Sequence, residues 1–213
     1  GVGLVQRSFP VGATDWIVRH RPPGPICHHM ANGGYLMWHL YPDYKVMIDG
    51  RVDIFGPKFT ELQIYNPSSF KVLDEEEDYH FGVVLVQYAH LDFKDAIFWL
   101  QESQNPEWRL VFVDDVACLF VRSTDANASL GVDLDAPDLF APLDPVDGMD
   151  QLWRYKARRN FYLAIRRPKQ ALAVWEEALE LYPQIVGRSV EHARLLFLCG
   201  EAERADLMLR SMA

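Results

Sequence analysis

The 213-residue chain has few cysteines, few positive charges and no long apolar run, and each shortage excludes a class of protein. Its three cysteines, Cys27, Cys118 and Cys199, are odd in number and far apart, so the sequence predicts neither a disulfide framework nor a zinc site. No stretch approaches the roughly 20 apolar residues that a membrane-spanning helix requires. With 21 Lys and Arg against 30 Asp and Glu, the net charge is −9, which argues against nucleic acid and against an anionic membrane surface as partners.

Sequence patterns of catalysis are equally scarce. The chain has no Gly-rich phosphate loop, no Ser-His-Asp set and no reactive-cysteine context. His28 and His29, with Asp49 and Asp53, supply side-chain types that several divalent ions accept. Adjacent histidines on a strand point to opposite faces, however, so both do not easily hold one ion. We therefore expect no catalytic residue, no metal site and no cofactor.

The acidic pair Asp114-Asp115 has two interpretations. Paired acids hold a metal–nucleotide complex in some glycosyltransferases. Between two apolar runs the pair also suits a tight turn, because aspartate is a common turn former. The turn is the interpretation that we favour.

What the chain does contain is sufficient for one good hydrophobic core, or for one core and a small appendage. Hydrophobic residues make up 49% of it and aromatic residues 13%. It begins Gly-Val-Gly-Leu, with no signal peptide and no initiating Met, from which we expect an excised soluble fragment.

Helical and strand-like segments alternate over residues 1–123. The run 81–88 is continuously apolar, which predicts a strand buried on both faces at the centre of a sheet. In chain order, the predicted elements are helix 11–20 (with Ala13, Trp16 and Ile17 inward), strand 26–30, helix 34–40, strand 45–48, helices 62–65 and 70–73, strand 81–88, helix 93–100, and strands 108–113 and 116–121. This order predicts an α/β domain: a small mixed sheet with helices on both faces and a terminal β-hairpin.

The composition changes after residue 123. Residues 124–150 hold seven aspartates, three prolines and no Lys or Arg, which predicts an acidic linker. Residues 151–213 are helical in periodicity and resemble about two tetratricopeptide repeats, a plain helical bundle being the alternative. The positions that match are Tyr155, Tyr162, Ala171, Trp175, Ala178, Pro183, Ala193, Leu196, Ala205 and Leu209. Arg158 and Arg159 depart from the pattern.

The most informative segment begins with a glycine pair and ends in Asp-Gly-Arg. Paired glycines let the backbone approach a ligand or another backbone closely, and charges at strand ends occupy the place where open α/β sheets keep their sites. We take Gly33, Gly34, Tyr35, Asp49 and Arg51 as candidate binding residues. The structural alternative is that Asp49 accepts hydrogen bonds from backbone N–H groups or from Arg51, fixing the turn, while the side chains of Tyr35 and Arg51 face solvent.

This segment resembles the soluble C-terminal, extracytoplasmic region of bacterial GT-C-type membrane glycosyltransferases, which are relatives of protein O-mannosyltransferases. The matching residues are Gly33, Gly34, Tyr35, Leu36, Trp38, Leu40, Tyr41, Pro42, Val46, Ile48, Asp49, Gly50 and Arg51. The resemblance continues through residues 81–88 and 108–122, so that it spans residues 8–123. It departs at residues 27–32, where members of the family commonly have an asparagine and aromatics.

The resemblance implies a part of a polytopic membrane protein, on the periplasmic or extracytoplasmic face of the inner membrane. Such a domain assists acceptor binding or positioning in an enzyme that uses lipid-linked sugar, and the catalytic carboxylates lie in loops of the membrane-embedded part. That part of the same protein is then its partner. The alternative is a non-catalytic interaction module whose C-terminal helices dock a partner protein.

Overall fold

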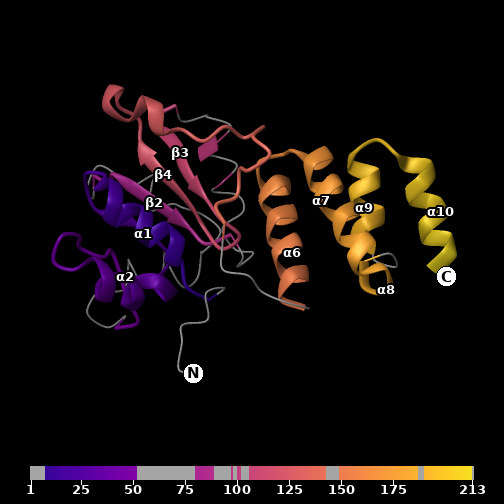
Figure 1. The fold of residues 1–213 in the computed structure, drawn as a ribbon, viewed down its shortest axis with the longest axis horizontal. Coiled ribbons are helices and arrows are strands. Elements are labelled where there is room, and N and C mark those ends of the chain that lie inside the picture. Colours follow the sequence, from indigo (N-terminus) through magenta and orange to yellow (C-terminus); the bar gives the residue numbers. More distant parts are fainter. Residues whose placement is uncertain are drawn as a thin grey trace. The chain divides into compact units, whose positions relative to one another are not determined.

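The computed structural model describes residues 8–51, 80–88, 97, 100–101, 106–142, 149–186 and 190–212 (Figure 1). The chain divides into two compact units, Gly1–Leu143 and Asp144–Ala213. The predicted helices 62–65 and 70–73, the acidic run 74–78, the side chain of Asp53 and most of the predicted helix 93–100 lie outside the described residues.

Helix α1, Val11–His20, has the predicted bounds and the predicted inward face. Ala13, Trp16 and Ile17 are all buried. The helix ends where Arg21 adopts a left-handed conformation and donates its N–H to the Ile17 carbonyl oxygen at 2.9 Å. The prolines that follow lack N–H donors, so the helical hydrogen-bond pattern does not continue.

The first unit contains a four-stranded mixed sheet in the order β1-β2-β4-β3 (Figure 1). The strands are β1 (Ile26–Cys27), β2 (Val83–Val86), β3 (Trp108–Val113) and β4 (Cys118–Arg122). Strand β1 runs parallel to β2, whereas β4 is antiparallel to both β2 and β3. The mixed α/β class is confirmed, and β2 lies between two neighbours, as its apolar sequence predicts.

Every residue from 81 to 88 is buried, which places the centre of this unit's core at β2. The strand begins against the proline-containing loop that ends α1. A Cβ atom on Gly82 would lie 1.7 Å from the Pro23 carbonyl oxygen, so the two backbones are in direct contact there. Only glycine permits so close an approach.

The predicted strand 45–48 is reduced to a single parallel bridge between Val46 and Ile26. The next N–H group, that of Met47, donates to the side chain of His28 (Nε2, 3.1 Å) and not to a carbonyl oxygen of a neighbouring strand. Strand β1 is correspondingly shorter than the predicted 26–30, and the chain turns at once into the 3-10 helix η2, Met30–Asn32.

The acidic segment after β4 is more ordered than its composition predicts. Residues Asp125–Leu130 form the 3-10 helix η6. The Val132 N–H then donates to the Leu110 carbonyl oxygen at 3.0 Å, and the Ala141 N–H to that of Val113 at 2.7 Å. The segment therefore supplies hydrogen bonds to strand β3, and the division between the units falls after Leu143.

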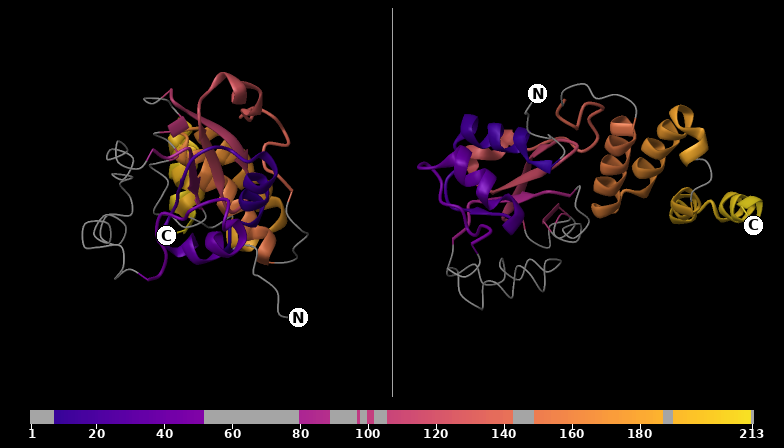
Figure 2. Two further views of the ribbon diagram at one scale, coloured as in Figure 1. Left: turned by 90° about the vertical axis from the view of Figure 1, so that its left-hand side faces the viewer. Right: turned by 90° about the horizontal axis from the view of Figure 1, so that it is seen from below.

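The described residues of the second unit form helices and the short turns between them. The helices are α6 (Met149–Ala164), α7 (Pro168–Leu181), α8 (Pro183–Val186), α9 (Val190–Leu198) and α10 (Ala202–Met212). Helix α6 packs on α7, α7 on α9 and α9 on α10, as the orange-to-yellow helices in Figure 2 show. Their contact layer buries Phe161, Ala171 and Trp175. None of the helices in the described ranges combines the length and the apolar character needed to cross a bilayer.

Candidate functional site

The two glycines of the candidate site have opposite surroundings. Gly33 is the first residue of helix α2, Gly33–Leu40, and a Cβ atom there would lie 1.9 Å from the Ile48 carbonyl oxygen and 2.7 Å from the Asp49 Cα. The helix thus begins in backbone contact with the segment that carries the Asp-Gly-Arg sequence. Gly34 is exposed, and no atom of the described residues lies within 4 Å of such a Cβ there.

Asp49 is buried and fully engaged by Arg51. Its carboxylate accepts the Arg51 backbone N–H at 2.8 Å and the guanidinium Nε at 3.0 Å, and Nη2 lies 2.5 Å from Oδ2. These hydrogen bonds from the Arg51 side chain hold the pKa of Asp49 below its usual value, although burial opposes them. The prediction that Asp49 accepts bonds from backbone N–H and from Arg51 is confirmed.

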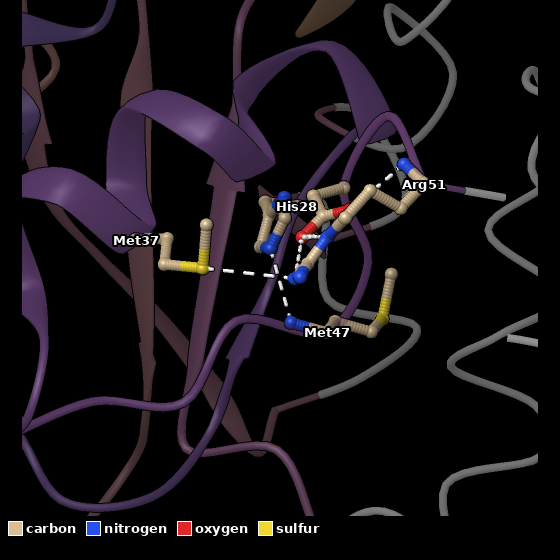
Figure 3. Close-up of polar contacts among 5 residues, drawn as sticks. His28, Met37, Met47 and Arg51 are labelled. Carbon is tan, nitrogen blue, oxygen red and sulfur yellow. Dashed lines mark hydrogen bonds and ion pairs between the residues drawn. The ribbon is translucent and has the colours of Figure 1, made fainter. Parts of the chain in front are cut away.

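The Arg51 side chain extends from this buried carboxylate to the surface. It is 62% exposed, and its Nη2 lies 3.8 Å from the Met37 sulfur on helix α2 (Figure 3). Its hydrogen bond to Asp49 raises the pKa of Arg51, so the guanidinium stays charged. The outer part of the group therefore presents a fixed positive charge beside the helix.

His28, which directly follows strand β1, connects the sheet to the segment that carries Asp49. Its Nδ1 lies 2.9 Å from the His29 carbonyl oxygen. Its Nε2 accepts the Met47 N–H, as Figure 3 shows. That pair of contacts defines a neutral ring protonated on Nδ1. Burial lowers the pKa of His28 to about 4. The ring therefore serves as a hydrogen-bonding part of the scaffold.

The prediction that Tyr35 faces solvent is wrong. Only 9% of the residue is exposed, and its ring lies 5.0 Å from that of Phe9 and 4.4 Å from that of His39. One residue on from the exposed Gly34, a helix has turned by about 100°, which points Tyr35 toward α1. Its hydroxyl interacts with the Thr14 side chain there, and burial raises its pKa.

Two exposed aromatic residues were not among the predicted site residues. Trp38 is 84% exposed and Tyr41 74% exposed. Together with Gly34 they follow the i, i+4, i+7 spacing of one helix face. That spacing is present in the sequence, but aromatic residues at helical spacing more commonly fill a core, and only the structure shows that this face is open.

Asp114 is a turn former, as its sequence position indicates. It is fully buried, and its Oδ1 accepts the N–H groups of Val116 and Ala117 at 2.7 Å each. Its Oδ2 faces the first turn of α1, where a Cβ on Gly12 would approach it to 2.6 Å. Burial raises the pKa of Asp114 to about 6.

The carboxylates of Asp49 and Asp114 are both held by contacts within the fold. Nowhere in the described ranges do three His, Cys, Asp or Glu side chains gather to hold a metal ion. The carboxylate of Asp49 is neutralised by Arg51 and that of Asp114 is enclosed by a turn. Helix α2, in contrast, presents the exposed Gly34 and Trp38 and the partly exposed Met37, whose sulfur lies 3.8 Å from Arg51 Nη2.

We predict that the two glycines respond oppositely to alanine. Gly33→Ala forces a Cβ into the Ile48 backbone and should lower the free energy of unfolding by about 3 kcal/mol. Gly34→Ala meets no atom and should raise it by up to about 1 kcal/mol, because alanine loses less backbone entropy in a helix. Urea unfolding of both variants measures this, and equal stabilities would contradict the observed backbone contact.

We predict that the titrations of His28 and of Asp114 change the free energy of unfolding in opposite directions as the pH rises. The folded-state pKa of His28 is about 4 against an ordinary 6.5, so its contribution is complete above pH 6.5 and is lost as the pH falls toward 4. The folded-state pKa of Asp114 is about 6 against 3.8, so its contribution is complete below pH 3.8 and is lost as the pH rises through 6. Each change is about 3 kcal/mol.

Between pH 4 and 6 the two effects nearly cancel in the unmodified chain. His28→Gln should therefore make stability fall with rising pH, and Asp114→Asn should make it rise. Urea unfolding of the three proteins across this range gives the free energy of unfolding of each at each pH. The other titratable groups are the same in all three proteins, so their contributions cancel when a variant is compared with the unmodified chain. Three parallel curves would show that neither group is shifted.

Comparisons of the chain with models of protein families, with curated proteins and with solved structures gave no match. The backbone contacts and side chains around helix α2 therefore carry the functional argument.

Proposed function

We propose that this chain is an extracytoplasmic, non-catalytic domain of a polytopic membrane glycosyltransferase that uses lipid-linked sugar. In this proposal it assists acceptor binding or positioning, and its partner is the membrane-embedded part of the same protein at the periplasmic or extracytoplasmic face of the inner membrane. The resemblance of residues 33–51 to GT-C-type enzymes supports it. So does the antiparallel pair β3 and β4, which we propose to be the terminal hairpin of such a domain.

The observation that carries this proposal is the difference in surroundings between the two glycines. Gly33 and Asp49 are occupied by contacts within the fold, which leaves them no part in chemistry. Gly34 instead leaves an open place on α2 among the described residues, and Met37, three residues further along the helix, has its sulfur 3.8 Å from Arg51 Nη2. An open place with an apolar thioether and a fixed guanidinium suits a ligand that has both apolar and polar or anionic groups, as an acceptor has.

We predict that Gly34→Leu in the full-length protein reduces sugar transfer at least about tenfold while leaving the fold intact, because the new side chain starts from a Cβ position that has no described atom within 4 Å and extends into the open place. Gly34→Ala is the matched control and should retain most of the activity. Transfer to the acceptor is measured in membranes, and thermal unfolding of the isolated chain checks the fold. Full activity of Gly34→Leu would contradict the proposed acceptor surface.

A second candidate function is supported by the helical unit, which we propose to be a tetratricopeptide-like segment that docks a partner protein. Several large apolar residues of α9 and α10 are exposed, among them Phe197 at 67% and Leu207 at 72%. Arg159, which departs from the repeat pattern, packs its guanidinium 4.5 Å from the Trp175 ring centre. The same transfer assay separates the candidates: loss of activity in Phe197→Asp but not in Gly34→Leu favours docking through the helices.

A further inference from the structure

We propose that the outer face of helix α10 joins two copies of this chain, with Leu207 at the centre of the contact and Glu203 of each copy opposite Arg210 of the other. The partner in this proposal is a second copy of the chain. The contact concerns α10 alone, and it holds whichever of the two candidate functions is correct.

Helix α10 has one packed side and one open side. It lies beyond α9, at the end of the row of helices that forms the second unit (Figure 1). Ala205 is 4% exposed and, with the half-buried Met208 and Met212, follows the i, i+3, i+7 spacing of the side that packs on α9. Leu207 points about 160° away from Ala205, and it is 72% exposed. The packing on α9 therefore leaves Leu207 uncovered.

Leu207 shares this open side with one acid and one base. Glu203, Leu207 and Arg210 follow the i, i+4, i+7 spacing of a single helix face, and all three are exposed. The acid lies near the start of the helix, the apolar side chain at its middle and the base near its end. Along the face, the order of side chains is therefore acid, apolar, base.

This order makes the face complementary to itself. In a two-fold symmetric contact, residue i of one copy meets residue j of the other, and j meets i. When two α10 helices pack antiparallel with Leu207 on the symmetry axis, Glu203 of each copy faces Arg210 of the other. Two contacts of opposite charge then flank an apolar centre, which is the usual arrangement of an interface.

The ion pairs within the chain are compatible with this contact. Among the described residues, no cation forms an ion pair with Glu203. Arg204 is turned back to Glu201, away from the open face. Arg210 Nη2 lies 2.8 Å from Asp206 Oδ2, and these two side chains are 78% and 59% exposed. Exposed pairs of this kind contribute little to stability, so Arg210 is available to Glu203 of a second copy.

The charge of the whole chain opposes the contact only weakly. The net charge is −9, but α10 contains two acids and two bases, so its own charges cancel. In about 0.1 M salt, charges interact over only about 10 Å, which screens the acids that lie far from the contact. Two helices of 11 residues bury less surface than a tight dimer does. We therefore expect weak association, with a Kd of about 100 μM.

The test is sedimentation velocity of the 213-residue chain from about 10 μM to about 1 mM. We expect the unmodified chain to pass from monomer to dimer across this range. Leu207→Asp should weaken the dimer at least about tenfold, because it places two carboxylates at the centre of the contact. Glu203→Arg and Arg210→Glu should each weaken it about tenfold, because each puts like charges opposite one another twice. These side chains are exposed, so thermal unfolding should not change.

An equimolar mixture of Glu203→Arg and Arg210→Glu is the sharpest arm of the test. In a dimer of one variant with the other, opposite charges again face each other at both ends of the contact. Such mixed dimers should form about as tightly as those of the unmodified chain. Mixing does not repair a variant that has lost its fold, so restored association identifies the contact itself.

Phe197→Asp is the matched control, because Phe197 on α9 is comparably exposed, at 67%. It should form dimers like the unmodified chain. A chain that stays monomeric across the range would overturn the proposal and leave the face of α10 to a different protein. A dimer that survives Leu207→Asp, or one that mixing of the charge variants does not restore, would also overturn it. None of these results bears on acceptor binding, which the Gly34→Leu assay tests separately.

Discussion

The backbone contact between Gly33 and residues 48 and 49 is the constraint on which the candidate site depends. It brings the start of α2 against the chain that carries Asp49, at a distance that no side chain on residue 33 permits. The turn is then fixed by the hydrogen bonds of Arg51 to the Asp49 carboxylate. Because two backbones and one ion pair share this place, α2 can expose its other face without losing its position.

From that fixed position the surface properties of α2 follow. Tyr35 and Leu36 are turned toward the core, whereas Gly34, Trp38 and Tyr41 are turned outward. The rings of Trp38 and Tyr41 therefore stay largely exposed to water.

Sequence reasoning succeeded where one local pattern determined the outcome. The period of α1 and the prolines after it gave both of its ends, and the continuous apolar run 81–88 indicated an interior strand. It failed where a tertiary contact replaced a local one. The strand 45–48 became a bridge because the His28 ring takes the Met47 N–H. Only the structure could show that Gly33 meets backbone while Gly34 meets nothing, since the two residues are identical in sequence.

The central claim is that Asp49 stabilises the fold and does not take part in a reaction. Its most direct test is the free energy of unfolding of Asp49→Ala, measured in urea near neutral pH. The account predicts a loss of about 1.5 kcal/mol, near the lower end for hydrogen bonds to a charged group, because water screens the exposed guanidinium of Arg51. A variant as stable as the unmodified chain would contradict the account.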